Sequence, residues 1–297
     1  MKAIPLKSST FNEKTIGWIH GFIGVVIFAG SLPATKVALT GFSAEFITVE
    51  RASIAGLIAL CLLLITRQKL PTKSQWLPIA FVSLGVVIGF PLFTALALQY
   101  MSSAASIVYI GILPLMTALF AVAYVQERPK PLFWLFACCG SGLILLYMYQ
   151  NNPASMLNFG SIYMLIAILL CGLGYAGGAK VAPQVGGWQV TCWALMLTLP
   201  VMLCLSVYYW DASYLSNPVA SYFGLGYVAL FSMLIGCFFW YKGLAMGGVA
   251  AVGQLQLFQP LIGLVLAAML LHESVSPSML LTSILLLVTV ACAKKYA

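Results

Sequence analysis

Charge is the scarcest property of this sequence. Asp, Glu, Lys and Arg together make up only 7% of its 297 residues, while 62% are hydrophobic and the mean hydropathy is +1.04. A soluble domain carries about 25% charged residues, and so few charges cannot cover a water-facing surface of this size. The composition therefore excludes a soluble globular protein and predicts that most of the surface faces lipid.

Acidic and metal-binding side chains are also few. The chain has 6 Asp and Glu residues, 2 His and 8 Cys, and no two cysteines form a CxxC pair. A membrane enzyme needs converging acids, histidines or metal ligands at membrane depth, whereas Glu50 is the one acid well inside an apolar run. We therefore predict that the protein is not an enzyme and binds no metal or cofactor. The same shortage disfavours a proton-driven exporter of cationic drugs, which needs a membrane-embedded carboxylate.

Long apolar runs, in contrast, fill almost the whole chain. Spanning a bilayer takes about 20 mainly apolar residues per helix, and a transmembrane β-barrel would show alternating segments of about 10 residues instead. The sequence predicts an all-α integral membrane protein with ten transmembrane helices, at residues 15–39, 45–65, 76–98, 103–125, 131–149, 158–181, 187–208, 219–241, 248–271 and 277–293.

The net charge of +8 is unevenly placed along the chain. Lys and Arg collect in the cytoplasmic loops of membrane proteins. With the N-terminus inside, only Lys36 and Arg51 fall on the outer side, and the inner side receives Lys2, Lys7, Lys14, Arg67, Lys69, Lys73, Arg128, Lys130, Lys180, Lys242, Lys294 and Lys295. The charge therefore indicates topology, not nucleic-acid binding. Both termini are predicted to be cytoplasmic, in a multi-pass protein of the bacterial inner (plasma) membrane.

Two distant stretches of the sequence resemble each other. "PLMTALFAVAYVQERPKP" (114–131) and "PLIGLVLAAMLLHESVSP" (260–277) align at an offset of 146, pairing Pro114 with Pro260 and Glu127 with Glu273. We therefore divide the chain into two five-helix repeats, residues 1–150 and 151–297. Because five is odd, the second repeat is predicted to be inverted in the membrane. Inverted repeats are typical of secondary transporters, whose substrate site lies near the midplane where the repeats meet.

At these residues the sequence resembles the drug/metabolite transporter superfamily, in particular its ten-helix EamA-type members. The resemblance lies in residues 100–131 and 245–277, in "SLPATKVAL" (31–39) and in Arg51 of helix 2, and the ten-span count and doubled domain extend it over nearly the whole chain. It implies a helix bundle with a central cavity lined mainly by helices 1, 3, 4, 6, 8 and 9. It also implies the transport of amino acids, metabolites or related small molecules, often outward.

Glutamines and aromatic residues are the cavity candidates. Helix 9 carries the densest polar cluster, Gln254, Gln256 and Gln259. A glutamine facing lipid leaves its amide unpaired, so these side chains point into the bundle, where they line a substrate cavity or bond neighbouring helices. Gln256 lies on the same helix face as Gly253, Pro260 and Gly263, and we expect its amide to bind a polar substrate. The candidates on the other helices are Tyr109, Tyr175, Trp240, Phe90 and Phe93.

Prolines and near-membrane charges are the hinge and gate candidates. Pro114 and Pro260 remove helix hydrogen bonds at equivalent positions of the two repeats, and Pro33 stands in the motif of helix 1. Each proline is either a hinge or an ordinary packing kink. The charged candidates lie near the outer ends of helices 1 and 2, where they either form a gate or a docking point for a charged substrate, or snorkel and pair with one another; they are Lys36, Glu50 and Arg51.

Taken together, these patterns predict a secondary transporter of small polar metabolites, amino acids or related compounds, that works by alternating access and favours export. An uptake carrier with the same fold is the alternative, while a membrane enzyme or a receptor is disfavoured. The expected partners are a small-molecule substrate and the lipid bilayer, without nucleic acid. The sequence leaves the oligomeric state open.

Overall fold

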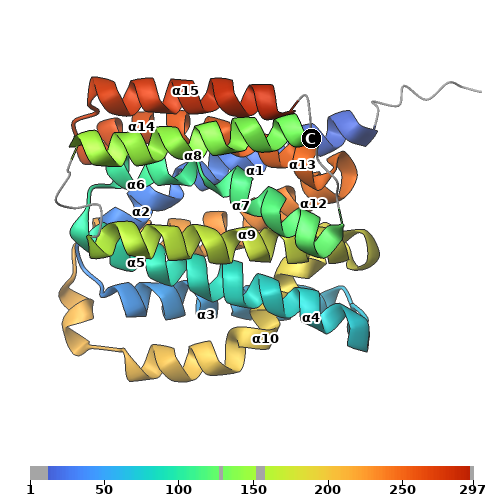
Figure 1. The fold of residues 1–297 in the computed structure, drawn as a ribbon. Coiled ribbons are helices and arrows are strands. Elements are labelled where there is room, and N and C mark those ends of the chain that lie inside the picture. Colours follow the sequence, from blue (N-terminus) through green and yellow to red (C-terminus); the bar gives the residue numbers. More distant parts are fainter. Residues whose placement is uncertain (1–12, 127–129, 152–157, 295–297) are drawn as a thin grey trace, which may run out of the picture.

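The computed structural model describes residues 13–126, 130–151 and 158–294, and within these ranges it leaves a few side chains undescribed, that of Gln254 among them. The described residues form helices that run along a common axis, without a strand (Figure 1). The first half contains α1 Glu13–Ala29, α2 Ser31–Ala38, α3 Ala44–Ile65, α4 Lys73–Val82, η1 Ser83–Gly89, α5 Phe90–Tyr100, α6 Ser103–Ile110, α7 Leu113–Phe120, η2 Ala121–Val125 and α8 Pro131–Asn151.

The second half of the described chain also consists mainly of helices. It contains α9 Phe159–Val185, α10 Gly187–Tyr208, η4 Ala212–Ser216, α11 Val219–Gly226, η5 Tyr227–Gly236, α12 Cys237–Gly247, α13 Val249–Gly253, η6 Gln254–Leu257, α14 Phe258–Leu271 and α15 Pro277–Lys294. Side-chain caps begin several of these helices: Ser43 accepts a hydrogen bond from the Phe46 amide, and Ser102 from the Ala105 amide. Such caps satisfy amides that have no partner within the helix itself.

Seven helical runs among the described residues are long and apolar enough to cross a membrane, namely Glu13–Ala38, Ala44–Ile65, Lys73–Tyr100, Ser103–Val125, Phe159–Val185, Gly187–Tyr208 and Val219–Gly247. Three of the predicted spans correspond to shorter apolar helices, Pro131–Gly140, Phe258–Leu271 and Pro277–Thr289. Large apolar side chains cover the outside, including Leu64, Val207 and Phe223. Because such a surface is stable only in lipid, the chain is a multi-pass membrane protein, and the count of ten spans stays a prediction.

The helices are arranged in layers (Figure 1). Helices α8 and α15 lie side by side at one edge of the bundle, and α3 and α10 pack together at the opposite edge. Between them, α1 packs on α12 and α5 packs on α9. Helix α1 begins and α15 ends at the same end of the bundle. The central layer is therefore enclosed by helix pairs that each take one member from either half.

Glycines allow the central helices to approach closely. A Cβ added at Gly85 of η1 would lie 2.1 Å from the carbonyl oxygen of Leu170 and 2.9 Å from the amide nitrogen of Gly174, both in α9. Similarly, a Cβ at Gly17 would lie 2.6 Å from the backbone of Gly247. Small residues at such interfaces are the usual means of close packing between transmembrane helices. They hold α9 and α1 against their partners on both sides of the bundle centre.

Helix ends at the edge of the bundle are tied by side chains from distant parts of the chain. The Glu273 carboxylate, just after α14, accepts hydrogen bonds from the Ser103 amide at 3.0 Å, the Ser103 hydroxyl at 3.0 Å and the Ala104 amide at 2.8 Å. A carboxylate at a helix N-terminus also meets the positive end of the helix dipole. Glu273 therefore joins the start of α6 to the α14–α15 connection. Its predicted twin, Glu127, lies outside the described residues.

Most of the central helices are interrupted within their length. Helix α1 gives way to α2 at Gly30, α6 to α7 at residues 111–112, and α13 reaches α14 through the 3₁₀ turn η6. The π-helical segments η1 and η5 interrupt the runs Lys73–Tyr100 and Val219–Gly247. Each of the three hinge candidates, Pro33, Pro114 and Pro260, stands in the first turn after a break, where the missing amide hydrogen costs little. The prolines thus follow breaks, whereas the sequence predicted kinks within continuous helices.

Candidate functional site

The broken helices meet around one cavity. Its lining comes from the α1–α2 junction, from η1 and the start of α5, from the α6–α7 break, from η5 and the start of α12, and from the start of α14, together with α3 and the unbroken α9. Discontinuous helices at mid-membrane are where transporters place their sites, and π-helical segments often mark functional positions. The lining residues are Phe28, Ser31, Arg51, Val86, Phe90, Leu113, Cys171, Tyr175, Ser232, Met233, Cys237 and Gln259.

The cavity is small in this conformation. Its volume is about 20 Å³, and a single water molecule needs roughly 10–15 Å³. One water molecule or two therefore fit, but a metabolite does not, because small-molecule sites usually enclose about 300–1,000 Å³. In this structure the surrounding side chains therefore leave no room for such a ligand.

One wall of the cavity is polar. The hydroxyls of Ser31 and Ser232 are 2.6 Å apart and hydrogen-bonded, and an Arg51 Nη atom donates to Ser232 Oγ at 3.3 Å. Gln259 donates a long hydrogen bond of 3.5 Å to the carbonyl oxygen of Phe28, while its own Oε1 has no partner. Arg51 Nε is also without a partner. This wall therefore offers a charged donor and an amide acceptor that the protein itself leaves unpaired.

Another part of the cavity wall, with the side chains behind it, is aromatic. The ring of Tyr175 lies 5.3 Å from that of Trp240 and 6.3 Å from that of Tyr241, and Trp240 lies 6.1 Å from Phe28. All four side chains are buried. A Cβ at Gly24 would contact the Trp240 backbone, whereas Ser31, further along the chain, meets Ser232. The cluster of Phe28, Tyr175, Trp240 and Tyr241 therefore closes the cavity toward the end of the bundle where α1 begins.

Of the three helix 9 glutamines, Gln259 is the one placed in the cavity lining. Gln256, which the sequence favoured, is fully buried but is not among the lining residues, and neither its Oε1 nor its Nε2 has a hydrogen-bond partner. The side chain of Gln254 lies outside the described part of the structure. Of the two candidate amides whose side chains are described, Gln259 therefore lines the cavity and Gln256 does not.

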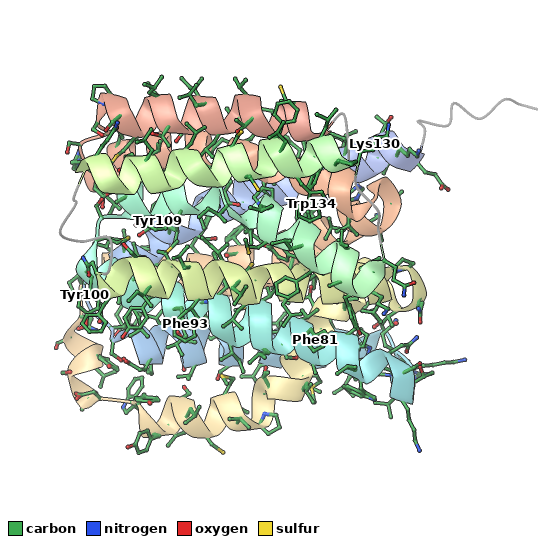
Figure 2. The ribbon with its side chains drawn as sticks, in the orientation of Figure 1. Phe81, Phe93, Tyr100, Tyr109, Lys130 and Trp134 are labelled. Atoms are coloured by element: carbon green, nitrogen blue, oxygen red, sulfur yellow. The ribbon has the colours of Figure 1, made fainter. Side chains whose placement is uncertain are left out.

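The aromatic candidates separate into two groups. Tyr175 and Phe90 line the cavity, and Trp240 stands directly behind Tyr175. Tyr109 and Phe93 lie elsewhere (Figure 2): the Tyr109 hydroxyl is 2.7 Å from Ser161 Oγ at the α6–α9 contact, and the Phe93 ring is 6.0 Å from that of Tyr163. In this conformation both residues therefore join helices of the bundle.

The charged gate candidates take three different positions. Lys36 Nζ donates to the carbonyl oxygens of Leu98 and Met101 at the end of α5, and cations are favoured at helix C-termini. The Glu50 carboxylate accepts a hydrogen bond from the Ser206 hydroxyl of α10. Arg51 alone of the three lines the cavity. The mutual ion pair that sequence reasoning left open for Glu50 and Arg51 is not formed among the described residues.

Several lining residues escaped the sequence analysis. Ser31 stands in the quoted "SLPATKVAL" stretch but was not singled out, and Phe28, Cys171, Ser232 and Cys237 belong to none of the quoted stretches. The one signal in the sequence was Gly30, which precedes Ser31, because a glycine inside an apolar helix can mark a close contact between helices. In the structure, a Cβ added at Gly30 would lie 2.4 Å from the Tyr227 hydroxyl oxygen. Ser232 lies in a π-helical segment that periodicity does not reveal. Among the described residues no group of three metal-ligating side chains is found.

Comparison with known families gives two matches within the chain. The model of the EamA-like transporter family matches residues 15–149 and again residues 158–293. The first matched segment begins where the predicted helix 15–39 begins, and the second where the predicted helix 158–181 begins. Together they cover most of the sequence.

Individual relatives and a solved structure agree with this result. The chain is 52% identical to the uncharacterized transporter YdeK of Bacillus subtilis (strain 168) over 96% of its own length and 99% of the relative's. It is 26% identical to an S-adenosylmethionine/S-adenosylhomocysteine transporter of Chlamydia muridarum (strain MoPn / Nigg), over 87% of this chain and 85% of the relative. The chain also matches a protein crystal structure at 15% sequence identity and a TM-score of 0.70. The alignment covers 95% of this chain and 97% of the chain in that structure, which shows that the two share a fold.

Proposed function

We propose, from the premise that this chain belongs to the EamA-like transporter family, that it is a secondary transporter which moves small polar metabolites across the membrane by alternating access. The family and the relatives are transporters and not enzymes. One observation carries the proposal: the broken helices of both halves meet at a cavity that now has room for water only. A substrate can be bound there only if the halves move apart, and such movement is the essence of alternating access.

The inverted repeat belongs to the same proposal. Shifting the numbering by 146 carries α5 onto α12, α3 onto α10, α8 onto α15 and the π-helical η1 onto η5. Exchange of the halves therefore converts the α1–α12 contact into the α9–α5 contact and leaves the pairs α3–α10 and α8–α15 unchanged. The double match of the family model supports the same division. Two such halves can open to either side with equivalent motions.

The substrate class follows from the cavity lining. Serine hydroxyls, a glutamine amide and one arginine suit a polar molecule, and the rings of Phe28, Phe90 and Tyr175 suit an apolar or aromatic portion. Amino acids and their derivatives combine the two. The relative named for S-adenosylmethionine transport moves a molecule of this kind. We favour export from the bacterial cytoplasm across the inner membrane, and uptake by the same fold is the alternative.

The transport proposal predicts substrate exchange by the purified protein. In liposomes preloaded with unlabelled compound, external radiolabelled compound should accumulate transiently, because a reversible carrier exchanges the two pools. The panel is the twenty L-amino acids, S-adenosylmethionine and a quaternary ammonium drug, with empty liposomes as the control. Exchange of an amino acid or S-adenosylmethionine would support the proposal. Exchange of the drug alone would contradict the substrate class.

The proposed topology, with both termini in the cytoplasm, predicts opposite labelling of two loops. In a variant whose exposed native cysteines are replaced, Ser216→Cys in η4 should react with an impermeant thiol reagent added outside intact cells, because the connection between α10 and α11 is then external. Ser74→Cys, at the start of α4, should react only after the membrane is permeabilised. Both serines are exposed, so the side of the membrane on which each one lies decides whether the reagent reaches it. The reverse labelling would overturn the orientation.

A further inference from the structure

Arg51 is a buried positive charge without a negative partner. Its side chain is 4% exposed and lines the central cavity from α3, about 10 Å from the beginning of that helix at 1.5 Å per residue. An Nη atom donates to Ser232 Oγ at 3.3 Å, and Nε has no partner. Among the described residues no carboxylate forms an ion pair with the guanidinium. A neutral hydroxyl orients the guanidinium but does not neutralise it.

The nearest acid in the sequence does not supply the missing charge. Glu50 precedes Arg51, but consecutive residues of an α-helix point about 100° apart, and Glu50 accepts its hydrogen bond from Ser206 of α10. The cavity lining itself contains no acidic residue. Arg51 is therefore the one charged group of the lining, and its charge is uncompensated there.

The fold itself does not require this charge. Helix α10 is the counterpart of α3 in the second half, and its sequence from Gly187 to Tyr208 contains no charged residue. The two helices pack against each other at one edge of the bundle. A helix of the second half thus packs at this edge of the bundle without a charged residue. An unpaired buried charge is costly, and within a membrane protein such residues mark ligand pathways.

We propose that Arg51 is the subsite for an anionic group of the transported substrate, a carboxylate, an inference that rests on the transport function proposed above. The guanidinium presents a planar set of donors that matches the two oxygens of a carboxylate. The substrate carboxylate would then neutralise the Arg51 guanidinium while the substrate is bound, and its negative charge would leave the site with the substrate. The unpaired Oε1 of Gln259 is an acceptor in the same lining, and it suits a substrate ammonium group.

The position of Arg51 also links charge recognition to the two halves. Its partner Ser232 belongs to η5 of the second half and is hydrogen-bonded to Ser31 of the first half. A carboxylate that takes hydrogen bonds from Arg51 competes with Ser232 for the same donor. Binding of the anion therefore loosens a contact that joins the halves, as a carrier needs at the moment when its substrate enters.

Ligand binding by the full-length protein tests the subsite independently of transport. The melting temperature of protein purified in detergent is measured in a chloride-free Hepes–Tris buffer, with each of the twenty L-amino acids and with its carboxamide. The amide has the same size without the negative charge. We expect at least one carboxylate to raise the melting temperature by several degrees, and its carboxamide to need a concentration at least tenfold higher. If no carboxylate raises the melting temperature, or if acid and amide act alike, the proposal is overturned.

Variants assign the effect to the residue. Arg51→Gln should remove the discrimination between acid and amide, Arg51→Lys should retain part of it, and Arg67→Gln, which removes an exposed arginine, should behave as the wild type. Without ligand, Arg51→Gln should melt at or above the wild-type temperature, because it removes an uncompensated charge. A lower melting temperature of ligand-free Arg51→Gln would show a structural role and overturn the proposal.

Two controls separate the neighbouring explanations. If sodium chloride gives the same Arg51-dependent stabilisation and carboxylates give none, the site binds an inorganic anion only, and the substrate part of the proposal is overturned. If carboxylates stabilise through Arg51 but the liposomes show no exchange, the anion subsite is supported and the transport proposal fails. If exchange occurs equally with carboxylates and carboxamides, transport stands and the subsite fails.

Discussion

Replacing Gly85 by alanine is expected to destabilise the protein by about 3 kcal/mol, at the upper end of the usual cost of overpacking. The added Cβ would lie 2.1 Å from the carbonyl oxygen of Leu170 and 2.9 Å from the amide nitrogen of Gly174. Both atoms belong to the backbone of α9, so no side chain can rotate out of the way. Relief requires η1 and α9 to separate, and this contact supports one side of the central cavity.

The comparison for Gly85→Ala is Gly226→Ala, the same substitution at the end of α11. A Cβ there meets nothing within 4 Å, and alanine stabilises a helix by about 0.5–1 kcal/mol relative to glycine. Melting of the detergent-purified proteins, followed by the loss of the monodisperse gel-filtration peak, should show a lower temperature for Gly85→Ala and an unchanged or higher one for Gly226→Ala. Equal melting of the two variants would show that η1 and α9 do not approach as closely as described.

The double variant Pro114→Ala, Pro260→Ala is expected to exchange substrate at least tenfold more slowly than the wild type, while its yield and melting temperature stay close to normal. Both prolines lie in the first turn after a break, where proline costs little. Within a continuous helix proline costs about 3 kcal/mol relative to alanine. The prolines therefore penalise any conformation in which α6 and α7, or α13 and α14, fuse into straight helices.

Alanine removes that penalty and lets straightened conformers accumulate, so fewer molecules complete the transport cycle. A matched control is Pro200→Ala, because Pro200 lies inside α10, is exposed on the outer surface and is not part of the cavity lining. Exchange in preloaded liposomes should be near the wild-type rate for Pro200→Ala. A wild-type rate in the double variant would reduce Pro114 and Pro260 to packing residues.

The sequence was sufficient for the class of protein and for the course of the chain. Apolar runs and the scarcity of charge predicted a multi-pass helical membrane protein, and the family match and the described helices agree. The reason is that lipid forces every backbone hydrogen bond to be made within the segment, so mean hydropathy over a stretch decides its structure locally. The sequence also predicted an internal repeat, which stays a prediction; the family model matches two segments of the chain.

The sequence predicted only part of the cavity lining, because the helices change their winding on the way to it. The periodicity of an α-helix advances about 100° per residue, whereas a 3₁₀ turn advances about 120°. Across the four residues of η6, Gln254–Leu257, this rotates the following face by roughly 80°. That rotation is consistent with Gln259, and not Gln256, being part of the cavity lining. The break between α6 and α7 likewise separates the face of Tyr109 from that of Leu113.

The state of Arg51 was decided by the tertiary structure alone. In the sequence it stands next to Glu50, and a mutual ion pair was one of the open interpretations. Whether two neighbouring charges meet depends on which helices surround them, because α3 presents Glu50 to Ser206 of α10 and Arg51 to Ser232 of η5. Composition and periodicity describe one segment at a time. Arg51 is without an ionic partner in the cavity because the lining residues, which come from seven predicted spans of both halves, include no acidic side chain.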